Sequence, residues 1–521
     1  MFLRTENWTP YKMAQTSDQN KTIAKNTFYL YLRLIVSMAI SLYTSRAILE
    51  ALGVEDYGIY NIVAGFVSML SFFTSALTSA AQRFITYELG TGNSDKLKRT
   101  FSTFTTLLLC FSVVIILLSF CVGNEIVKNV LNIPQNRIPA AINVFYLSCI
   151  GFCINIIATP YIACITAHEK MNFYALACIS ESFLKLIIVF MLYVSTFDHL
   201  ETYAVLIVVV ALINRSLYGI YCNKRFMETK FRILIDIPIL KEIYSFSVWV
   251  IFGCSAMIAK EQGVNMLINR FFDVTINAAR GVSMQVFGIL NQFANSIATA
   301  INPQITKSYA SGDIQRAINL TFVLSKAQGI MLLFLAVPLF LEMNFILNLW
   351  LKNVPYYAVN FAKWVVVICV TSTLRETYIA LYLATGKVRF LEIVGGFIIL
   401  LNLPLSYIVL KMGAAPISTM MINVVLEICC MIACFGYMQK IVSFPAFSYY
   451  KNVIFPLAIT AFIAYLFGTI ILMEFENSFL RLFLVCIITT ISIGLFSYII
   501  VLNRKERILV IDMVRKKMRK T

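Results

Sequence analysis

Charged residues and histidine are scarce in this sequence. Of its 521 residues only 13% are charged and two are histidine, whereas 60% are hydrophobic. Soluble domains carry about 25% charged residues and separate their apolar positions by polar ones. The composition therefore excludes a soluble multidomain protein. The two histidines, His168 and His199, both lie near predicted loops and indicate neither a metal site nor a catalytic triad.

Motifs for nucleotide and metal chemistry are also missing. The Gly386-Lys387 pair lacks the upstream glycine of a phosphate-binding loop, so direct use of ATP is not expected. No two aspartates have the D-x-D spacing of a metal-dependent sugar-nucleotide transferase. We therefore expect no cofactor, no metal and no enzymatic activity. The polar first 25 residues lack a signal-peptide pattern, so the first helix should remain as an anchor.

Two abundant features have simple explanations. Nearly all of the 13 cysteines lie within apolar runs, where they act as small packing residues and indicate no disulfide framework. The formal net charge of +17 could suggest nucleic acid, but the basic residues concentrate at helix ends and in the C-terminal tail. That distribution is typical of a membrane protein, so no nucleic-acid partner is expected.

Apolar runs longer than about 18 residues recur from end to end, and each is a candidate membrane helix. The pattern predicts an all-α polytopic membrane protein with about fourteen spans. Their expected bounds are 26–49, 57–84, 100–123, 139–166, 172–195, 202–222, 242–270, 275–303, 319–342, 357–384, 389–410, 413–438, 452–473 and 479–502.

Loop charges predict the orientation. Lysine and arginine crowd the alternate loops around 96–99, 224–232 and 440–451 and the C-terminal tail, whereas the opposite loops hold only Lys128, Arg137, Lys352 and Lys411. By the positive-inside rule both termini are cytoplasmic, which requires an even number of spans. The chain is therefore expected to cross the membrane many times, with both of its ends on the cytoplasmic side.

A weak internal repeat suggests two related halves. The segment from Leu52 to Phe101 aligns without a gap 220 positions later, so that Val54 matches Val274 and Gly92 matches Gly312. Six predicted helices separate the copies, which predicts two six-helix lobes in parallel orientation and two further helices. The expected segments are a cytoplasmic tail 1–25, an N-lobe 26–222, an inter-lobe loop 223–241, a C-lobe 242–438, helices 13 and 14 at 439–502, and a basic cytoplasmic tail 503–521.

Ionisable residues inside the predicted spans are the main functional candidates, because charge in hydrocarbon is costly. Eight are basic and four acidic, which predicts an electropositive cavity for an anionic ligand: Arg33, Glu181, Lys185, Arg215, Lys260, Glu261, Arg270, Arg280, Lys363, Arg375, Glu376 and Glu427. The four-residue spacing of Glu181 and Lys185 favours a structural ion pair. Arg375 and Glu376 are adjacent and should point about 100° apart, so they are not expected to neutralise each other.

From this set we select Arg33, Lys260 and Arg280, with Arg375, as ligands for an anion. Glu427 is expected to be paired across helices or to bind a proton, so Glu261 and Glu427 are the possible ion-coupling residues. Amides in the second and eighth predicted spans suit a wet cavity that contacts sugar hydroxyls: Asn61, Gln285, Asn291, Gln292 and Asn295. Pro160, Pro338 and Pro404 are expected to bend their spans.

The segment ALGVEDYGIYNIVAGFVSML from Ala51, followed by SALTSAAQRF from Ser75, resembles the first-repeat signature of bacterial polysaccharide flippases. These O-antigen and capsule repeat-unit transporters belong to the MOP superfamily, which also holds the MATE drug exporters. The resemblance implies two lobes that open alternately to either side, as in MATE transporters. It implies as cargo an undecaprenyl-pyrophosphate-linked oligosaccharide, flipped for surface polysaccharide or lipopolysaccharide assembly. The expected partners are that lipid, membrane lipids and other polysaccharide-assembly proteins.

Two alternatives remain. A MATE-like, ion-coupled multidrug exporter would be expected to favour acidic cavity residues for cationic drugs. A membrane glycan polymerase usually carries a large outer loop with catalytic basic residues, and the outer connections expected here, around 123–138 and 343–356, are short.

Overall fold

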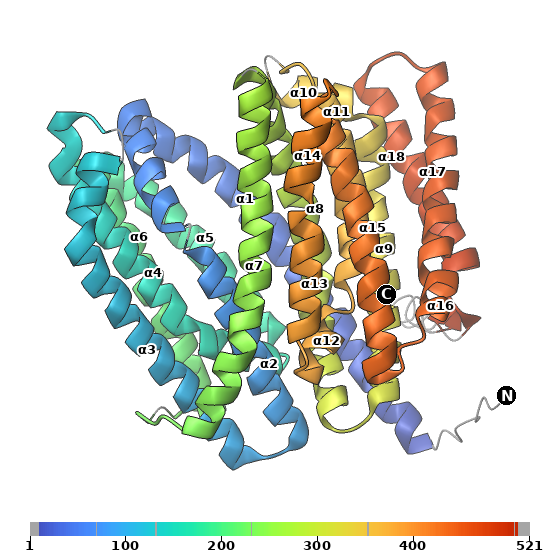
Figure 1. Ribbon diagram of the computed structural model, residues 1–521, viewed down its shortest axis with the longest axis horizontal. Helices are drawn as coiled ribbons and strands as arrows, with labels where there is room; N and C mark the ends of the chain where they lie inside the picture. Colours follow the sequence, from blue (N-terminus) through green and yellow to red (C-terminus); the bar gives the residue numbers. More distant parts are fainter. Residues whose placement is uncertain are drawn as a thin grey trace. The chain divides into compact units, whose positions relative to one another are not determined.

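The computed structural model describes residues 10–68, 70–130, 133–230, 232–272, 274–351, 354–504 and 506–508. Every element in these ranges is a helix, and no strand occurs among them. Twelve helical segments in the described ranges are long and apolar enough to cross a membrane. The protein is therefore an all-helical, multi-pass membrane protein, as predicted (Figure 1).

The two predicted spans that are absent from these twelve are 57–84 and 275–303, the two copies of the repeat. The first is divided between two helices, α1 (Pro10–Ser68) and α2 (Ser71–Thr91). The second lies in α8 (Val274–Ala310), which is 37 residues long and therefore falls short in hydropathy rather than in length. When these two more polar segments are added to the twelve, the number of spans agrees with the prediction of about fourteen.

The chain folds into two compact units. Unit 1 comprises the chain up to Ile251 together with Thr299–Ser311, and unit 2 comprises Phe252–Ala298 and the chain from Gly312 onward. Two long helices, α7 (Ile237–Phe271) and α8, therefore contribute residues to both units.

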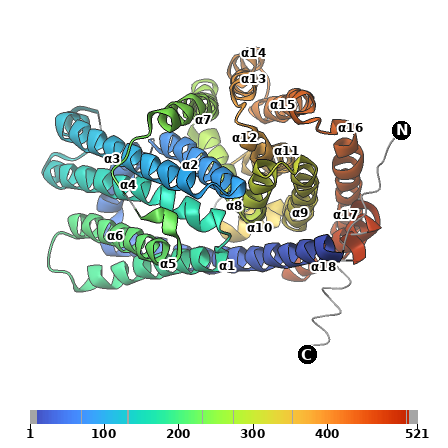
Figure 2. The ribbon, with the colours of Figure 1, turned by 90° about the horizontal axis from the view of Figure 1, so that it is seen from below.

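Unit 1 is a bundle in which α4 packs against α2, α3 and α6, while α1 lies along α5 (Figures 1 and 2). Apart from α1, α2 and its parts of α7 and α8, the helices of this unit are α3 (Ser94–Glu125), α4 (Ile138–Ala167), α5 (Met171–Val194) and α6 (His199–Arg225). A π turn at Ile126–Val130 and 3-10 turns at Gln135–Arg137 and Met227–Thr229 complete it.

In unit 2, α11 packs against α9 and α15, and the last two long helices pack on α9 and on each other. Besides its parts of α7 and α8, this unit contains α9 (Ile314–Leu341), α10 (Met343–Trp350), α11 (Ala358–Glu376), α12 (Ile379–Thr385), α13 (Arg389–Leu400), α14 (Asn402–Lys411), α15 (Ser418–Val442), α16 (Ala446–Tyr449), α17 (Phe455–Glu474) and α18 (Phe479–Phe496). A π turn at Tyr450–Ile454 precedes α17, and another at Ser497–Val501 follows α18.

The first helix starts earlier than predicted. Residues 10–25 of the predicted polar tail are helical and continue into α1. The helix begins at a proline, whose missing N–H costs nothing there, and no proline or glycine follows before Gly53. At Gly53 a positive φ of 77° kinks α1. Most of the predicted C-terminal tail, from residue 509 onward, lies outside the described residues.

The repeat has a local structural counterpart at its helix ends. Gly92 and Gly312 both adopt a left-handed conformation, with φ of 75° and 84°; Gly92 is the first residue after α2 and Gly312 the second after α8. Asn93 and Asp313 then cap the next helix, each side chain accepting a hydrogen bond from the backbone N–H three residues on. The kink at Gly53 also matches the interval between α7 and α8, which is 220 positions later.

Two predicted spans of unit 2 are interrupted. The span 357–384 breaks between α11 and α12, where the Leu374 carbonyl accepts hydrogen bonds from the hydroxyls of Thr377 (2.9 Å) and Tyr449 (3.0 Å). The span 389–410 breaks at Leu401, three residues before Pro404, which cannot donate to the Leu400 carbonyl. Helices α4 and α9, by contrast, run through Pro160 and Pro338.

Buried ion pairs tie the helix ends together. In unit 2, Arg481 of α18 donates to Glu342 at 2.8 and 2.6 Å, and Lys326 of α9 pairs with Glu506 at 2.8 Å. In unit 1, the Glu169 carboxylate accepts from Lys307 Nζ and Gln304 Nε2, both at 2.9 Å. The Glu169 carbonyl also accepts from Asn26, at 3.2 Å, which fixes the α4–α5 turn to α1 and to the end of α8.

At the other end of α4, Arg137 binds two aspartates. Its Nε donates to Asp56 at 2.8 Å and its Nη1 donates to Asp198 at 2.6 Å. Asp198 also caps α6 by accepting from the N–H groups of Leu200 and Glu201. Partial burial disfavours the ionised form of Asp198, but the bonds from Arg137 and from these N–H groups outweigh it and lower its pKa.

We expect the Asp198→Asn variant to unfold at a lower temperature than the wild type near neutral pH, while asparagine still caps α6. Because the pKa of Asp198 is lower in the folded state, its stabilisation is present above its ordinary value of 3.8 and is lost as the pH falls through the lowered pKa. Thermal unfolding in detergent at a series of pH values measures the difference.

The matched control is Glu476→Gln, which removes an exposed carboxylate from the loop between α17 and α18. It should leave the unfolding temperature unchanged throughout the series. A difference between wild type and Asp198→Asn that persists unchanged at the most acid pH would contradict the assignment.

Candidate functional site

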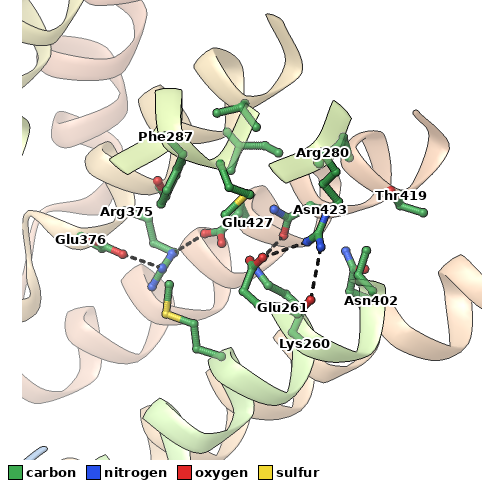
Figure 3. A pocket seen from close by; sticks show the side chains of 17 residues that line it. Lys260, Glu261, Arg280, Phe287, Arg375, Glu376, Asn402, Thr419, Asn423 and Glu427 are labelled. Atoms are coloured by element: carbon green, nitrogen blue, oxygen red, sulfur yellow. Dashed lines mark hydrogen bonds and ion pairs between the residues drawn. The ribbon is translucent and has the colours of Figure 1, made fainter. Parts of the chain in front are cut away.

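A small, charged pocket lies within unit 2, where α7, α8, α11, α14 and α15 meet (Figure 3). Its volume of about 30 Å³ has room for little more than a water molecule. The polar and charged residues that line it are Lys260, Glu261, Arg280, Ser372, Arg375, Glu376, Asn402, Thr419, Asn423 and Glu427. In this conformation the pocket is a closed charge cluster rather than an open cargo site.

Glu261 links the first two cations of the cluster. Its carboxylate contacts Lys260 Nζ at 3.0 Å and Arg280 Nη2 at 2.9 Å. Lys260 also donates to Asn423 Oδ1 at 3.3 Å, and Arg280 donates to the side chain of Asn265. Only 5% of Lys260 and 3% of Arg280 is exposed, and the buried Nε of Arg280 has no hydrogen-bond partner among the described residues.

Arg375 lies between two carboxylates on the other side of the pocket (Figure 3). Its Nε donates to Glu427 Oε2 at 2.5 Å, and its Nη2 lies 3.1 Å from Glu376 Oε1. The expectation that Arg375 and Glu376 do not neutralise each other is therefore wrong. Both residues lie within α11, and the long Arg375 side chain reaches across the angle between them.

Both helix interruptions of unit 2 coincide with this pocket. Glu376 is the last residue of α11, and Asn402 is the first residue of α14. Broken spans in membrane proteins expose backbone groups only where these line a protein-filled or wet interior, and transporters build binding sites at such breaks. The pocket therefore has the construction of a functional site.

The charges of the pocket balance, which corrects the sequence-based prediction. Three cations, Lys260, Arg280 and Arg375, face three carboxylates, Glu261, Glu376 and Glu427. The prediction of an electropositive cavity is therefore wrong for this pocket. The reason is physical: three unpaired cations buried among apolar helices would cost several kcal/mol each, so each has a carboxylate partner.

The other predicted site residues do not line this pocket. Arg33 belongs to unit 1, where its Nη1 contacts Cys178 Sγ at 3.8 Å and its guanidinium lies 5.3 Å from the centre of the Tyr174 ring. Asn61, also in unit 1, is exposed on α1. On α8, Gln285 and Gln292 are exposed, and Asn295 donates to Asn291.

Sequence reasoning missed four uncharged polar pocket residues: Ser372, Asn402, Thr419 and Asn423. One signal was available: Asn423 lies four residues before Glu427, so both side chains share a face of α15. No pattern in the sequence pointed to Asn402, because its position depends on the break at Leu401. Glu376 was recognised as an intramembrane acid but not as a member of the site.

The pairing of Arg375 with Glu427 gives a stability test. Glu427→Gln leaves a buried guanidinium with one carboxylate instead of two, and should destabilise the protein by about 3 kcal/mol. The triple variant Arg375→Met/Glu376→Gln/Glu427→Leu removes the guanidinium together with both of its carboxylates and should be closer to the wild type. Thermal unfolding of the purified variants measures both, and a single variant as stable as the triple variant would contradict the pairing.

Three comparisons with known proteins bear on this chain. Residues 23–309 match a protein family described as polysaccharide biosynthesis protein. No curated protein sequence matches the chain significantly. Among solved structures, the chain is similar to a multidrug resistance MATE family transporter of the MOP superfamily in an outward-facing conformation, with 14% identity, a TM-score of 0.68, and coverage of 81% of this chain and 96% of that one.

Two further structures show the same fold. A MATE protein in a bent conformation has 12% identity and a TM-score of 0.72, and covers 82% of this chain and 96% of its own. A MOP superfamily transporter from Pyrococcus furiosus, whose binding pocket is described as having reverse polarity, has 13% identity and a TM-score of 0.68 over 81% of this chain and 96% of its own. The match covers more than half of the sequence, so this chain belongs to the polysaccharide biosynthesis protein family and has the fold of MATE and MOP transporters.

Proposed function

We propose that this protein flips an undecaprenyl-pyrophosphate-linked oligosaccharide repeat unit across the bacterial cytoplasmic membrane by alternating access, for O-antigen or capsule assembly. The observation that carries the proposal is the family match over residues 23–309. Family and fold indicate a transporter rather than an enzyme. Both termini are cytoplasmic in this proposal, as the loop charges predict.

The charge cluster of unit 2 supplies the chemistry for the pyrophosphate. Lys260 and Arg280 share one carboxylate, Glu261, and the Arg280 Nε has no partner among the described residues. Guanidinium groups bind phosphate oxygens in a bidentate manner. An arriving pyrophosphate therefore competes with Glu261 for the two cations once the pocket opens.

Displacement of the carboxylates couples cargo to a second ion. A carboxylate that loses its cation within the membrane must take up a proton or another cation, because an unpaired buried charge is costly. Glu261 and Glu427 are in this position, since each is paired directly with a pocket cation. In this proposal they are the ion-coupling residues, and Lys260, Arg280 and Arg375 are the anion-binding residues.

The double variant Glu261→Gln/Arg280→Gln removes one cation and one carboxylate together, so the total charge of the pocket stays the same, while Lys260 keeps its hydrogen bond to Asn423. We expect it to lower export by at least about 30-fold, the effect of losing roughly 2 kcal/mol of interaction with a buried charge. The measurement is surface glycan in a deletion strain that expresses the variant. Loss of function should leave single lipid-linked repeat units unflipped on the cytoplasmic side.

The matched control is Glu342→Gln/Arg481→Gln, which removes a buried ion pair of the same unit that does not line the pocket. It should export glycan like the wild type at equal protein level. Normal export by Glu261→Gln/Arg280→Gln would reject the pyrophosphate assignment of this pocket.

The balanced charge of the pocket also favours a second candidate, an ion-coupled multidrug exporter. Three carboxylates within the membrane could receive a cationic drug in exchange for an ion. That function requires dye efflux on expression and its loss in Glu427→Gln. A deletion strain that accumulates no lipid-linked repeat units but loses dye efflux would select this alternative.

A further inference from the structure

Unit 1 contains a second cavity, about 220 Å³ in volume and thus much larger than the pocket of unit 2. At about 30 Å³ per molecule, this volume corresponds to roughly seven waters. The residues that line it come from α1, α4, α5 and α6: Tyr60, Ala64, Val67, Leu147, Ser148, Gly151, Phe152, Asn155, Glu181, Lys185, Ala204, Ile207, Val210 and Ala211.

Small side chains create this space. Ala64, Gly151, Ala204 and Ala211 lie on three different helices, and all of them line the cavity. A Cβ atom built on Gly151 would meet only Val208, at 3.7 Å, so no close backbone contact requires a glycine there. Close packing, the usual reason for small residues between membrane helices, does not account for a space of this size.

The cavity contains charge near the middle of a membrane helix. Glu181 and Lys185 of α5 form an ion pair of 2.6 Å, yet 36% and 45% of their side chains remain exposed. Ionisable side chains within spans face a protein interior or a wet cavity rather than lipid. The pair was predicted to be structural, and its partly exposed side chains also line the cavity, where a ligand can reach them.

The rest of the lining suits a hydroxylated ligand. Asn155 of α4 is exposed in the cavity wall, and Ser148 lies two turns before it on the same helix. Tyr60, whose ring packs edge to face on Tyr203 with centroids 4.7 Å apart, and Phe152 supply aromatic surface. Carboxylate, ammonium and amide groups bind hydroxyls, and aromatic rings cover the apolar faces of a sugar.

We propose that this cavity binds one pyranose ring, with Glu181, Lys185 and Asn155 holding its hydroxyl groups and Tyr60 and Phe152 covering its C–H face. The inference rests on the proposed function, because it assigns one sugar of the glycan cargo to unit 1. The intact ion pair makes the site neutral, so it selects an uncharged sugar. The anionic part of the cargo belongs to the separate cluster in unit 2.

The test is sugar binding by the full chain in nanodiscs of phosphatidylcholine, with methyl glucoside and N-acetylglucosamine as probes, followed by saturation-transfer NMR. Wild type should bind at least one of the two. Ala211→Phe fills the cavity and should weaken binding by about tenfold or more. Its control is Leu212→Phe, the neighbouring exposed position on α6, which should bind like the wild type.

A second variant guards against misfolding of Ala211→Phe. Glu181→Gln/Lys185→Met removes both charges at once and should also weaken binding by about tenfold. Undiminished binding by both variants would overturn the proposal, as would a wild type that binds neither probe. Sugar binding that phosphatidylglycerol abolishes by competition would assign the cavity to a lipid headgroup, and would also overturn the proposal.

Export assays on the same variants separate this inference from the proposed function. A wild type that exports glycan but binds neither sugar rejects the cavity site alone. A wild type that binds sugar in an Ala211-dependent way but exports no glycan keeps the site and rejects the proposed function.

Discussion

Charge is expensive in hydrocarbon, and this cost accounts for the arrangement of the ionisable residues inside the spans. In unit 2, Lys260, Arg280 and Arg375 are each at least 90% buried, and each contacts a carboxylate at 3.0 Å or less. Removing one member of such a pair costs several kcal/mol, whereas the intact pair contributes little net stability. Stability alone therefore does not explain why the charges are there, which agrees with the role in transport that we propose for them.

The ion pairs that line the cavities of the two units differ in burial. In unit 2, three cations and three carboxylates surround a space for little more than one water. The cations are therefore bound by carboxylates of the protein itself. Unit 1 leaves an ion pair partly exposed on the wall of a larger cavity. In the functions that we propose, the cargo replaces the internal partners of the first cluster, whereas the second site binds a neutral ligand without breaking its ion pair.

The fold followed closely from the sequence, because long apolar runs and short polar connections specify membrane helices almost completely. The predicted bounds 139–166 and 172–195, for example, agree within a few residues with those of α4 and α5 in the structure. The polarity of Gln285 and Gln292 also marked α8 as different from the other spans. The break at Leu401 agrees with the bend expected from Pro404, whereas the break after Glu376 was not predicted, since it depends on the Tyr449 hydroxyl, which is distant in sequence.

The candidate site was predicted in part. The residues Lys260, Glu261, Arg280, Arg375 and Glu427 were all selected as intramembrane charges, and the structure brings them to one pocket. Their partners could not be read from spacing, because pairing across helices depends on helix rotation. Thus Arg280 and Glu261, on separate helices, form a pair, while the i,i+4 pair of Glu181 and Lys185 could be predicted from local geometry.

Glu169 has one consequence for motion. Its φ of 58° is a left-handed conformation that costs a non-glycine residue about 1 kcal/mol. The conformation belongs to the C-terminal cap of α4, in which the N–H of Glu169 donates to the Thr166 carbonyl at 2.9 Å and the N–H of Lys170 donates to the Ile165 carbonyl at 3.0 Å. Movement of the end of α8 would therefore break the two bonds to the Glu169 carboxylate but leave the shape of the α4–α5 turn unchanged, because the cap is made by α4 itself.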